Sequence, residues 1–307
     1  MSNPIISNLL LSEPVTAKSV KLNNGILMPI VGFGTFRVKG YDLIHMVLET
    51  ALEAGYRLID TAAVYNNEED IGTALEKLLP KYNLKREDIF ITSKLAPSNH
   101  GNYEIVSKAV QSSLKKLRTS YLDLYLIHWP GIQRVAAGND DNFKWRTSSW
   151  NALSKIYREE KILRAIGISN YTVSHVNQLL SVPDVVVPAV NQVEFHPYWQ
   201  QSSEFHKVSN EANIILQAYC SLGGSSDQAL LLDPVVSAVA KENNVTPAQV
   251  LLRWGLQKGY AIIPKTATIS RIHENVNINF LLPDKAMKAI SDIKKIEKFA
   301  WNPDVVS

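Results

Sequence analysis

The sequence predicts an α/β protein folded as a single (β/α)8 barrel domain that takes up all 307 residues. Short apolar runs alternate with helical patterns almost to the end of the chain, and this alternation is typical of a parallel sheet. Eight such units suffice to close a barrel. No low-complexity stretch or glycine fingerprint divides the chain, which disfavours the alternative of two doubly wound domains.

An N-terminal hairpin is predicted before the barrel, over residues 20–30. The dipeptide Asn24-Gly25 lies between two apolar runs there, which is a strong hairpin signal. Residues 1–19 carry only short apolar clusters and no basic residue before Lys18. We therefore expect residues 1–19 to form a flexible N-terminal extension rather than a signal peptide.

The barrel units follow in order along the chain. The predicted strands are Val31–Gly34, Leu58–Asp60, Ile89–Ser93, Leu122–His128, Ala165–Ser169, Val187–Glu194, Ile214–Tyr219 and Tyr260–Ile263. The helices predicted after them are Asp42–Ala54, Glu69–Leu79, Tyr103–Leu117, Ser148–Glu159, Thr172–Leu180, Ser202–Ala212, Pro234–Asn243 and Arg271–Asn279. Extra helices near the C-terminus are predicted at Pro247–Gln257 and Asp284–Ile296.

Composition limits the kinds of molecule that the protein is expected to bind. A net charge of +3 is too small to predict nucleic-acid binding, and no apolar run reaches the ~18 residues of a membrane span. The single cysteine, Cys220, excludes an intramolecular disulfide and is typical of a reducing compartment. Gly32 and Gly34 begin a possible dinucleotide loop, but Arg37 stands where its third glycine belongs. We expect a cytoplasmic protein that binds neither nucleic acid nor a membrane.

Polar side chains follow several predicted strands, at the edge where a barrel carries its chemistry. Asp60, Lys94 and His128 each come at the end of an apolar run, and Tyr65 follows Asp60 closely. An ammonium group beside a phenol is expected to lower the pKa of Tyr65, with Asp60 keeping Lys94 charged. Taken singly, Asp60 and Lys94 could be a structural ion pair and His128 a core histidine. Together the four residues predict a site that moves protons.

A metal-dependent hydrolase is the alternative reading of the barrel. Glu194 and His196 alternate along a predicted strand and could face a metal ion. The seven histidines are scattered, however, and no His-x-His pair occurs. We therefore expect no metal site.

The chain resembles the aldo-keto reductase family, in its short-loop branch, through motifs that occur in the family's order. The matching segments are Gly55–Ala62 with Tyr65, Glu68 and Ile71-Gly72, then Ala165–Tyr171, Ile263–Thr266 with Arg271 and Glu274-Asn275, Gly32–Thr35, and Leu126–Pro130. The resemblance extends over residues 20 to about 303. It implies reduction of an aldehyde or ketone to an alcohol, with hydride from NADPH and the proton from Tyr65. It also implies a monomer whose partner is this small carbonyl substrate.

The resemblance also implies roles for individual residues. The catalytic set would be Asp60, Tyr65, Lys94 and His128. Within the cofactor set, Ser169, Asn170 and Gln192 would bind the carboxamide of NADPH (NADP+), Tyr219 would stack on its ring, and Lys265, Thr266 and Arg271 would meet its 2′-phosphate. The complete implied cofactor set is Gly34, Thr35, Asp60, Ser169, Asn170, Gln192, Tyr219, Leu222, Ala248, Ile263, Lys265, Thr266, Arg271, Glu274 and Asn275.

Departures from the family pattern concern the substrate. Ala96 and Phe36 stand where many members carry tryptophan, and the connection Gly131–Ser148 is short. These features predict a permissive pocket lined by Phe36, Tyr65, His128 and Trp129. Two alternatives stay open: a specialised reductase resembling a prostaglandin F synthase, and a non-catalytic subunit that senses NADPH.

Overall fold

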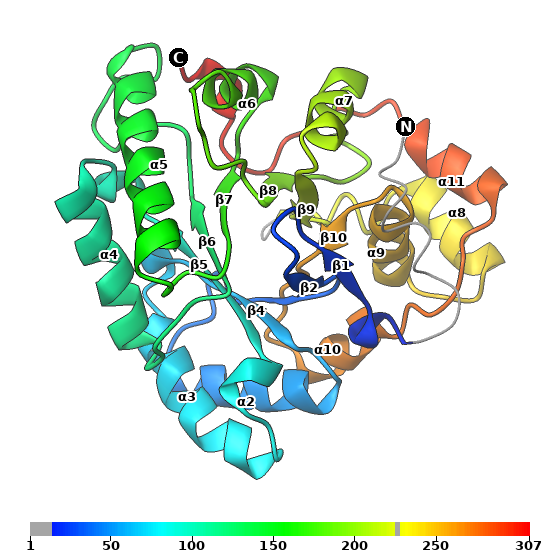
Figure 1. Cartoon of the computed structure of the whole chain (residues 1–307). Helices are drawn as coiled ribbons and strands as arrows, with labels where there is room; N and C mark the ends of the chain where they lie inside the picture. The colour runs from blue at the N-terminus through cyan, green and yellow to red at the C-terminus, as the bar shows by residue number, and fades with distance from the viewer. Residues whose placement is uncertain (1–13, 225–227) are drawn as a thin grey trace.

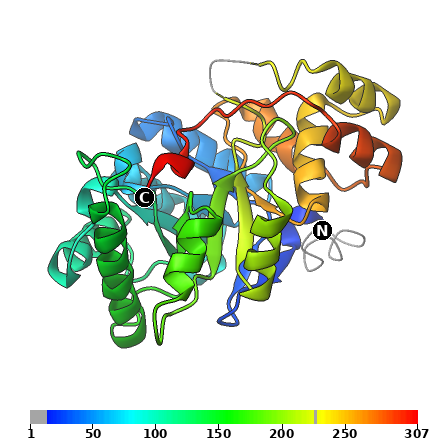
Figure 2. The same ribbon diagram turned by 90° about the horizontal axis from the view of Figure 1, so that it is seen from above.

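Eight parallel strands form one curled sheet with helices packed around its outside (Figures 1 and 2). The computed structural model describes residues 14–224 and 228–307. The strands are β3 (Phe33–Gly34), β4 (Leu58–Asp60), β5 (Phe90–Leu95), β6 (Leu124–Ile127), β7 (Ile166–Ser169), β8 (Val190–Glu194), β9 (Ile215–Tyr219) and β10 (Ala261–Ile262). Neighbours in the sheet are neighbours in the chain from β3 to β10, which confirms the predicted barrel order.

The sheet closes between β10 and the segment that leads into β3. The N–H of Gly32 donates to the carbonyl of Ile262 at 2.8 Å, and the N–H of Gly34 donates to that of Pro264 at 3.0 Å. A Cβ atom on Gly34 would lie 2.8 Å from the carbonyl oxygen of Ile263, so a side chain would force the two segments apart. These glycines therefore permit barrel closure.

The predicted hairpin is confirmed and covers the N-terminal end of the barrel. Strands β1 (Ser19–Lys21) and β2 (Leu27–Pro29) pair antiparallel. The side-chain amides of Asn23 and Asn24 donate to the carbonyls of Pro188 and Arg164, at 3.0 and 2.9 Å. Those carbonyls precede β8 and β7, so the turn of the hairpin is tied to the sheet's N-terminal edge.

The predicted flexible extension lies partly outside the described residues, which begin at residue 14. Val15–Ala17 forms the 3-10 helix η1, and Val15 is 1% exposed. The N–H of Val15 donates to Oδ1 of Asn279 at 2.8 Å. Residues 15–19 therefore belong to the packed structure, because burying Val15 anchors them against the helical shell.

Amphipathic helices surround the sheet. They are α2 (Tyr41–Glu53), α3 (Glu68–Lys81), α4 (Tyr103–Lys116), α5 (Asp141–Glu159), α6 (Val173–Leu180), α7 (Ser203–Glu211), α8 (Pro234–Glu242), α9 (Pro247–Gln257), α10 (Ile269–Val276) and α11 (Asp284–Ser291). Most end within a few residues of the prediction. In α2, for example, Ile44, Val47 and Leu48 recur at helical spacing and are fully buried against the sheet.

Three predicted helix bounds are wrong, those of α5 and α10 for a local reason. Helix α5 begins at Asp141 rather than Ser148, since the buried Asn142 amide bonds the carbonyls of the preceding loop. Helix α10 begins at Ile269 rather than Arg271, because the carbonyl of Thr268 already accepts from the N–H of Arg271. Helix α11 ends at Ser291 rather than Ile296.

After α11 the chain runs as a mostly extended segment, residues 292–307, which we call the C-terminal strap. It crosses the end of the barrel where the strands finish and reaches α5 and α6 (Figures 1 and 2, red), whose side chains of Arg146 and His175 bond its last two residues. Its short helix η5 is Pro303–Val305. The strap therefore lies over the same end of the barrel as the predicted site.

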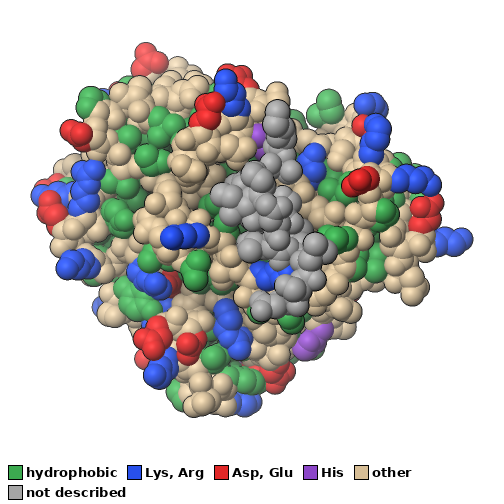
Figure 3. Space-filling model, turned by 45° about the vertical axis from the view of Figure 1, so that its right-hand side comes forward, with side chains coloured by type: hydrophobic (Ala, Val, Ile, Leu, Met, Phe, Trp, Pro, Cys, Tyr) green, Lys and Arg blue, Asp and Glu red, His purple; other side chains and the backbone are tan. Residues whose placement is uncertain are grey.

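The surface carries both signs of charge. Figure 3 shows acidic and basic side chains interspersed on one face, as the net charge of +3 leads one to expect. Within residues 14–224 and 228–307, no helix combines the length and apolar character needed to cross a bilayer.

Candidate active site

Asp60 and Lys94 form a buried ion pair where their strands end. Asp60 is the last residue of β4, Lys94 lies in β5, and both side chains are buried. Nζ of Lys94 donates to Oδ1 of Asp60 at 2.6 Å and to the carbonyl of Thr61 at 2.8 Å. Burial lowers the pKa of Lys94, and the Asp60 carboxylate opposes that shift. The ion pair is therefore what keeps a buried ammonium group charged.

Tyr65 completes this cluster from the short helix η2 (Ala63–Tyr65). Its hydroxyl accepts a hydrogen bond from Nζ of Lys94 at 3.4 Å. Burial first, and then the negative charge of Asp60, raise the pKa of Tyr65 well above its usual value. The expectation that Lys94 lowers this pKa is therefore wrong, because desolvation and Asp60 outweigh the ammonium. The structure holds a neutral phenol beside a cation.

His128 follows β6 directly and lies beside Tyr65. The two rings are 5.7 Å apart in an edge-to-face arrangement. Burial and then the charge of Lys94 lower the pKa of His128 well below its usual range, so the imidazole is neutral at pH 7. Its Nδ1 atom is buried and has no hydrogen-bond partner among the described residues. The neutral ring therefore keeps hydrogen-bonding capacity that the described residues do not use.

A hydrogen-bond network joins the predicted carboxamide-binding residues to the cluster. The amide of Asn170 donates to Oγ of Ser169 at 3.0 Å and to the carbonyl of His128 at 2.9 Å. Oδ1 of Asn170 accepts from the hydroxyl of Tyr219 at 2.6 Å. Nε2 of Gln192 donates to Oδ2 of Asp60 at 2.7 Å. The structure thus brings these four residues together beside Asp60.

Asn170 is also conformationally unusual. Its φ of 64° lies in the left-handed region, which Asn tolerates better than most residues. The same residue bonds its backbone N–H to the carbonyl of Gln192 at 3.0 Å. These contacts fix both the backbone and the amide of Asn170.

The residues predicted to meet a 2′-phosphate lie around the start of α10. Lys265 and Arg271 are exposed, whereas Thr266 is buried and its Oγ1 accepts from the N–H of Thr268 at 3.0 Å. Within the described chain, Thr268 makes no side-chain cap to this helix. The first N–H groups of α10 are therefore open to an anion.

The other predicted cofactor residues are spread around this rim. Thr35 is buried and its hydroxyl donates to the carbonyl of Asp60 at 2.9 Å. Glu274 accepts from the hydroxyl of Thr246 at 2.5 Å, and Asn275 is buried. Gly34 and Ile263 take part in barrel closure, and Leu222 and Ala248 are half-buried. Glu274 and Asn275 thus have structural contacts of their own, and their contact with a cofactor stays a prediction.

The sequence prediction missed a second cation near Lys265. Arg37 has a left-handed φ of 61°, and its guanidinium carbon lies 5.2 Å from the centre of the Phe36 ring. Burial and the positive charge of Arg37 together lower the pKa of Lys265. Two cations placed this close together favour the binding of an anion between them. A basic residue directly after Thr35-Phe36 was the available signal.

Aromatic rings lie beside Tyr65 and His128. The Phe36 ring is 5.1 Å from that of Tyr65, and the Trp129 ring is stacked 6.3 Å from that of His128. Trp301 packs edge-to-face on Trp129 at 5.2 Å. The sequence assigned no role to Trp301, because nothing local connects a residue of the tail with the end of β6.

Glu194 and His196, the metal-ligand candidates, bond each other instead. Nε2 of His196 lies 3.0 Å from Oε1 of Glu194. The strap supplies the other partners of this carboxylate, among them Lys298 and the N–H of Phe299. Among the residues that the structure describes, no group of three or more His, Cys, Asp or Glu side chains is placed to hold a metal ion.

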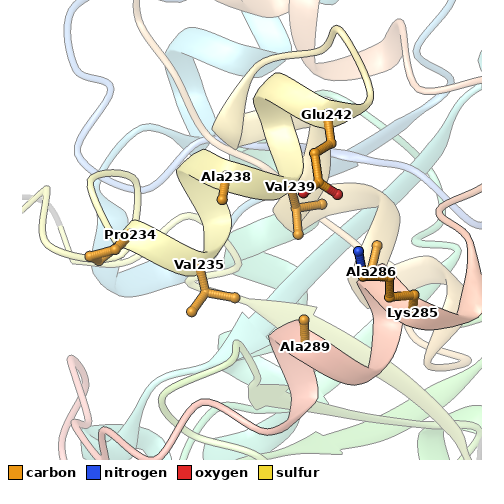
Figure 4. Close-up of a pocket in the computed structure, with 8 residues that line it drawn as sticks. All are labelled: Pro234, Val235, Ala238, Val239, Glu242, Lys285, Ala286 and Ala289. Atoms are coloured by element: carbon orange, nitrogen blue, oxygen red, sulfur yellow. The ribbon is translucent and has the colours of Figure 1, made fainter.

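An apolar pocket elsewhere lies between α8 and α11 (Figure 4). Its lining residues are Pro234, Val235, Ala238, Val239, Glu242, Lys285, Ala286 and Ala289. This lining is mostly small and aliphatic, and all of it is distinct from the cluster around Lys94. The chemistry of the molecule is concentrated at the barrel mouth.

Comparison with known proteins adds an independent finding. A family model described as "Aldo/keto reductase family" matches residues 31–295. The chain is 41% identical to glyoxal reductase of Bacillus subtilis, over 93% of this chain and 96% of that protein. It is 36% identical to glycerol 2-dehydrogenase (NADP(+)) of Saccharomyces cerevisiae, over 91% and 92% respectively. An aldo-keto reductase enzyme from a Medee basin deep-sea metagenome library has a crystal structure that superposes with a TM-score of 0.83 at 37% identity, covering 94% of this chain and 100% of that chain.

Proposed function

The chain belongs to the aldo/keto reductase family, and from that premise we propose that it reduces aldehydes and ketones to alcohols with NADPH. One observation carries the proposal: Nζ of Lys94 lies 2.6 Å from Asp60 and 3.4 Å from the hydroxyl of Tyr65. This arrangement couples a phenolic proton donor to a buried ammonium group. Two relatives, a glyoxal reductase and an NADP(+) glycerol 2-dehydrogenase, support by their names the substrate and cofactor classes.

Tyr65 donates the proton to the carbonyl oxygen in this proposal. The raised pKa of Tyr65 keeps the phenol protonated at neutral pH, which is the form that a general acid requires. As its O–H bond breaks, negative charge develops on the phenolic oxygen, and the hydrogen bond from Lys94 stabilises that charge. Asp60 holds Lys94 in place through its 2.6 Å ion pair.

His128 orients the substrate. Its low pKa leaves the imidazole neutral, so one ring nitrogen carries a proton and can donate to the carbonyl oxygen. The ring lies 5.7 Å from that of Tyr65, which lets both groups approach the same oxygen. Two hydrogen bonds to one carbonyl oxygen polarise the carbon toward hydride addition.

Residues of this chain fit NADPH at two places. Ser169, Asn170 and Gln192 would hold its carboxamide, since Tyr219 uses only one of the two lone pairs on Oδ1 of Asn170. Lys265, Thr266 and Arg271 would hold the 2′-phosphate beside the open start of α10. The other residues proposed to line the cofactor are Gly34, Thr35, Asp60, Tyr219, Leu222, Ala248, Ile263, Glu274 and Asn275. Bound NADPH supplies the hydride.

The test is NADPH oxidation with a panel of aldehydes, ketones and quinones. We expect Tyr65→Phe to lower kcat about 10³-fold, because the variant has no proton to give, while tryptophan quenching reports unchanged NADPH affinity. Tyr125→Phe is the matched control, since Tyr125 is a fully buried tyrosine of β6 outside the cluster. Its kcat should equal that of the wild type.

Other outcomes separate the alternatives. A wild-type protein that binds NADPH and reduces no member of the panel would contradict the enzyme and favour an NADPH-sensing subunit. Turnover of a prostaglandin endoperoxide alone would favour the specialised reductase.

We also propose that the protein is a cytoplasmic monomer folding as one domain. The support is a single eight-stranded sheet and one cysteine, Cys220, which is unpaired. Light scattering at the mass of one chain, 34.3 kDa, with a single unfolding transition would agree with this. A stable dimer or two separate transitions would contradict it.

A further inference from the structure

A buried carboxylate at the end of β8, that of Glu194, takes no part in the proposed reaction. It accepts hydrogen bonds from Nε2 of His196 at 3.0 Å and from the backbone N–H of Phe299 at 2.6 Å. Nζ of Lys298 and the N–H of Ala300 complete its set of donors. Because an unpartnered buried carboxylate strongly destabilises a fold, these donors and the carboxylate hold one another in place.

Most of these donors belong to the C-terminal strap. The N–H groups of Phe299 and Ala300 point at one side chain rather than at a neighbouring strand. The Phe299 ring also packs 4.8 Å from that of His196. Glu194 therefore fixes the backbone of the strap at Phe299 and Ala300. Without it, this part of the strap would be held by the packing of Phe299 and by the N–H of Glu297, which donates to the carbonyl of Tyr198 at 3.1 Å.

A second anchor holds the far end of the strap. Val306 is buried, and its carbonyl accepts from Nε2 of His175 at 3.0 Å. The N–H of Ser307 donates to the carbonyl of Ala137 at 2.9 Å. Between the two anchors the strap crosses the mouth of the barrel (Figure 2, red). The residue that directly follows the Glu194 anchor is Trp301.

Trp301 extends the row of rings beside the reacting groups. It packs at 5.2 Å on Trp129, which is stacked on His128, and Phe36 lies against Tyr65. Both Phe36 and Trp301 are 50% exposed, so each has ring surface available to a ligand. A planar aromatic substrate can contact several of these rings at once, whereas a short aliphatic one cannot.

We propose that Glu194 is a positioning residue that sets the affinity for aromatic carbonyl substrates without touching them. By binding the backbone at Phe299 and Ala300, it keeps Trp301 against Trp129 as an outer wall of the pocket. This inference rests on the proposed reductase function and adds to it a substrate class and a residue that selects for it.

The experiment compares 4-nitrobenzaldehyde with propanal in the wild type, Glu194→Gln, Trp301→Ala and the double variant. For 4-nitrobenzaldehyde we expect KM to rise about fivefold in each single variant with kcat little changed, since a lost ring contact weakens binding. For propanal, KM and kcat should stay within about twofold of the wild type. The KM of the double variant for 4-nitrobenzaldehyde should be no higher than that of Trp301→Ala, because both changes remove the same contact.

Asp123→Asn is the matched control, because Asp123 is also a buried carboxylate that accepts from a backbone N–H. It should leave KM for both aldehydes unchanged. If Glu194→Gln does not fold, Lys298→Met removes one of the strap's donors to Glu194 and should raise KM for 4-nitrobenzaldehyde alone, by less than Glu194→Gln is expected to. Equal losses for both aldehydes, an unchanged KM, or additive effects in the double variant would each overturn the proposal.

A readout without substrate separates this inference from the proposed function. Packed indoles give an exciton signal in circular dichroism, and Trp301→Ala should abolish the part that comes from the Trp129–Trp301 pair. Glu194→Gln should reduce the same signal. If the wild type reduces neither aldehyde, the proposed function fails. A signal that Trp301→Ala removes and Glu194→Gln leaves intact overturns the clamp itself.

Discussion

Asp123 and Asp60 are two buried carboxylates at opposite ends of the same barrel. Asp123 precedes β6 at the N-terminal edge, and its oxygens lie 2.8 Å from Arg86 and 2.7 Å from Arg164. It also accepts from the N–H of Ile91 at 2.9 Å. Asp60 ends β4 at the opposite edge and accepts from Lys94 and from Gln192.

The difference lies in the cation. Arginine keeps its charge at any working pH, and its planar donors fill the lone pairs of a carboxylate, so the Asp123 cluster is complete in itself. Lys94 has three donors on one atom; Asp60 and Thr61 use two, and the third reaches the hydroxyl of Tyr65. The same fold therefore builds a structural pair at one end and a reactive pair at the other.

Exchanging lysine and arginine at the two ends should give the largest effect and tests whether the cation decides the role of each ion pair. Lys94→Arg should lower kcat for aldehyde reduction about 10³-fold, because a bulkier planar group in a fully buried position cannot contact Asp60, Thr61 and Tyr65 from one atom. Arg164→Lys at the other end should leave kcat unchanged and lower the free energy of unfolding by about 1 kcal/mol or less. Steady-state kinetics and urea unfolding check both. Wild-type kcat in Lys94→Arg would refute the reactive role.

Removing the charge of Asp123 should lower stability and leave kcat unchanged, in contrast to Lys94→Arg, which should lower kcat. Asp123→Asn leaves two guanidinium groups without their carboxylate, so we expect the free energy of unfolding to fall by about 3 kcal/mol. Because this end is remote from Tyr65, kcat and KM of the folded variant should match the wild type. Urea unfolding followed by kinetics at low temperature measures the two effects. A large fall in kcat per folded molecule would show that the two ends are coupled.

Acid should lower the free energy of unfolding by a smaller amount than Asp123→Asn does, through two histidines near the mouth of the barrel. Burial lowers the pKa of His100 and of His175 to about 4, and their Nε2 atoms bond the carbonyls of Trp129 and Val306. Since the unfolded histidines have a pKa near 6.5, the unfolded state binds more protons between pH 6.5 and 4. Stability is therefore present above pH 6.5 and is lost as the pH falls through this window.

At pH 5.5 each of these two histidines should lower the free energy of unfolding by about 1 kcal/mol relative to pH 7.5. Urea unfolding at both pH values measures the sum, and His175→Gln should remove its own share of the slope. Hydrogen exchange should rise in the strap near Val306 before it rises in the hairpin. A slope that His175→Gln leaves unchanged would contradict the assignment.

Most of the fold was predictable because its signals are local. The apolar runs and amphipathic helices follow short periodicities, and Asn24-Gly25 specifies a hairpin turn within a few residues. The start of α5 was mispredicted because the first turns of this helix are polar. Its residue Asn142 is buried by contacts with the loop that precedes the helix. Periodicity carries no signal for such a turn.

The candidate site also has features that the sequence predicted and features that it did not. Asp60, Lys94 and His128 were predictable because each ends an apolar run, and the carboxyl ends of parallel strands meet at one edge. The protonation state of Tyr65 was not predictable from the sequence. Burial raises the pKa of Tyr65 and outweighs the effect of the Lys94 ammonium group. Desolvation depends on everything packed around a group, and no spacing in the chain encodes it.

By itself, then, the amino-acid sequence determined the order of strands and helices, the single barrel they build and the polar residues at its mouth. Only the tertiary structure decided that Gly32 and Gly34 close the sheet, and that Glu194 holds the strap which carries Trp301 to Trp129. The physical reason is distance along the chain. Backbone preferences and hydrophobic periodicity act between near neighbours, whereas these contacts join residues that only the closed barrel brings together.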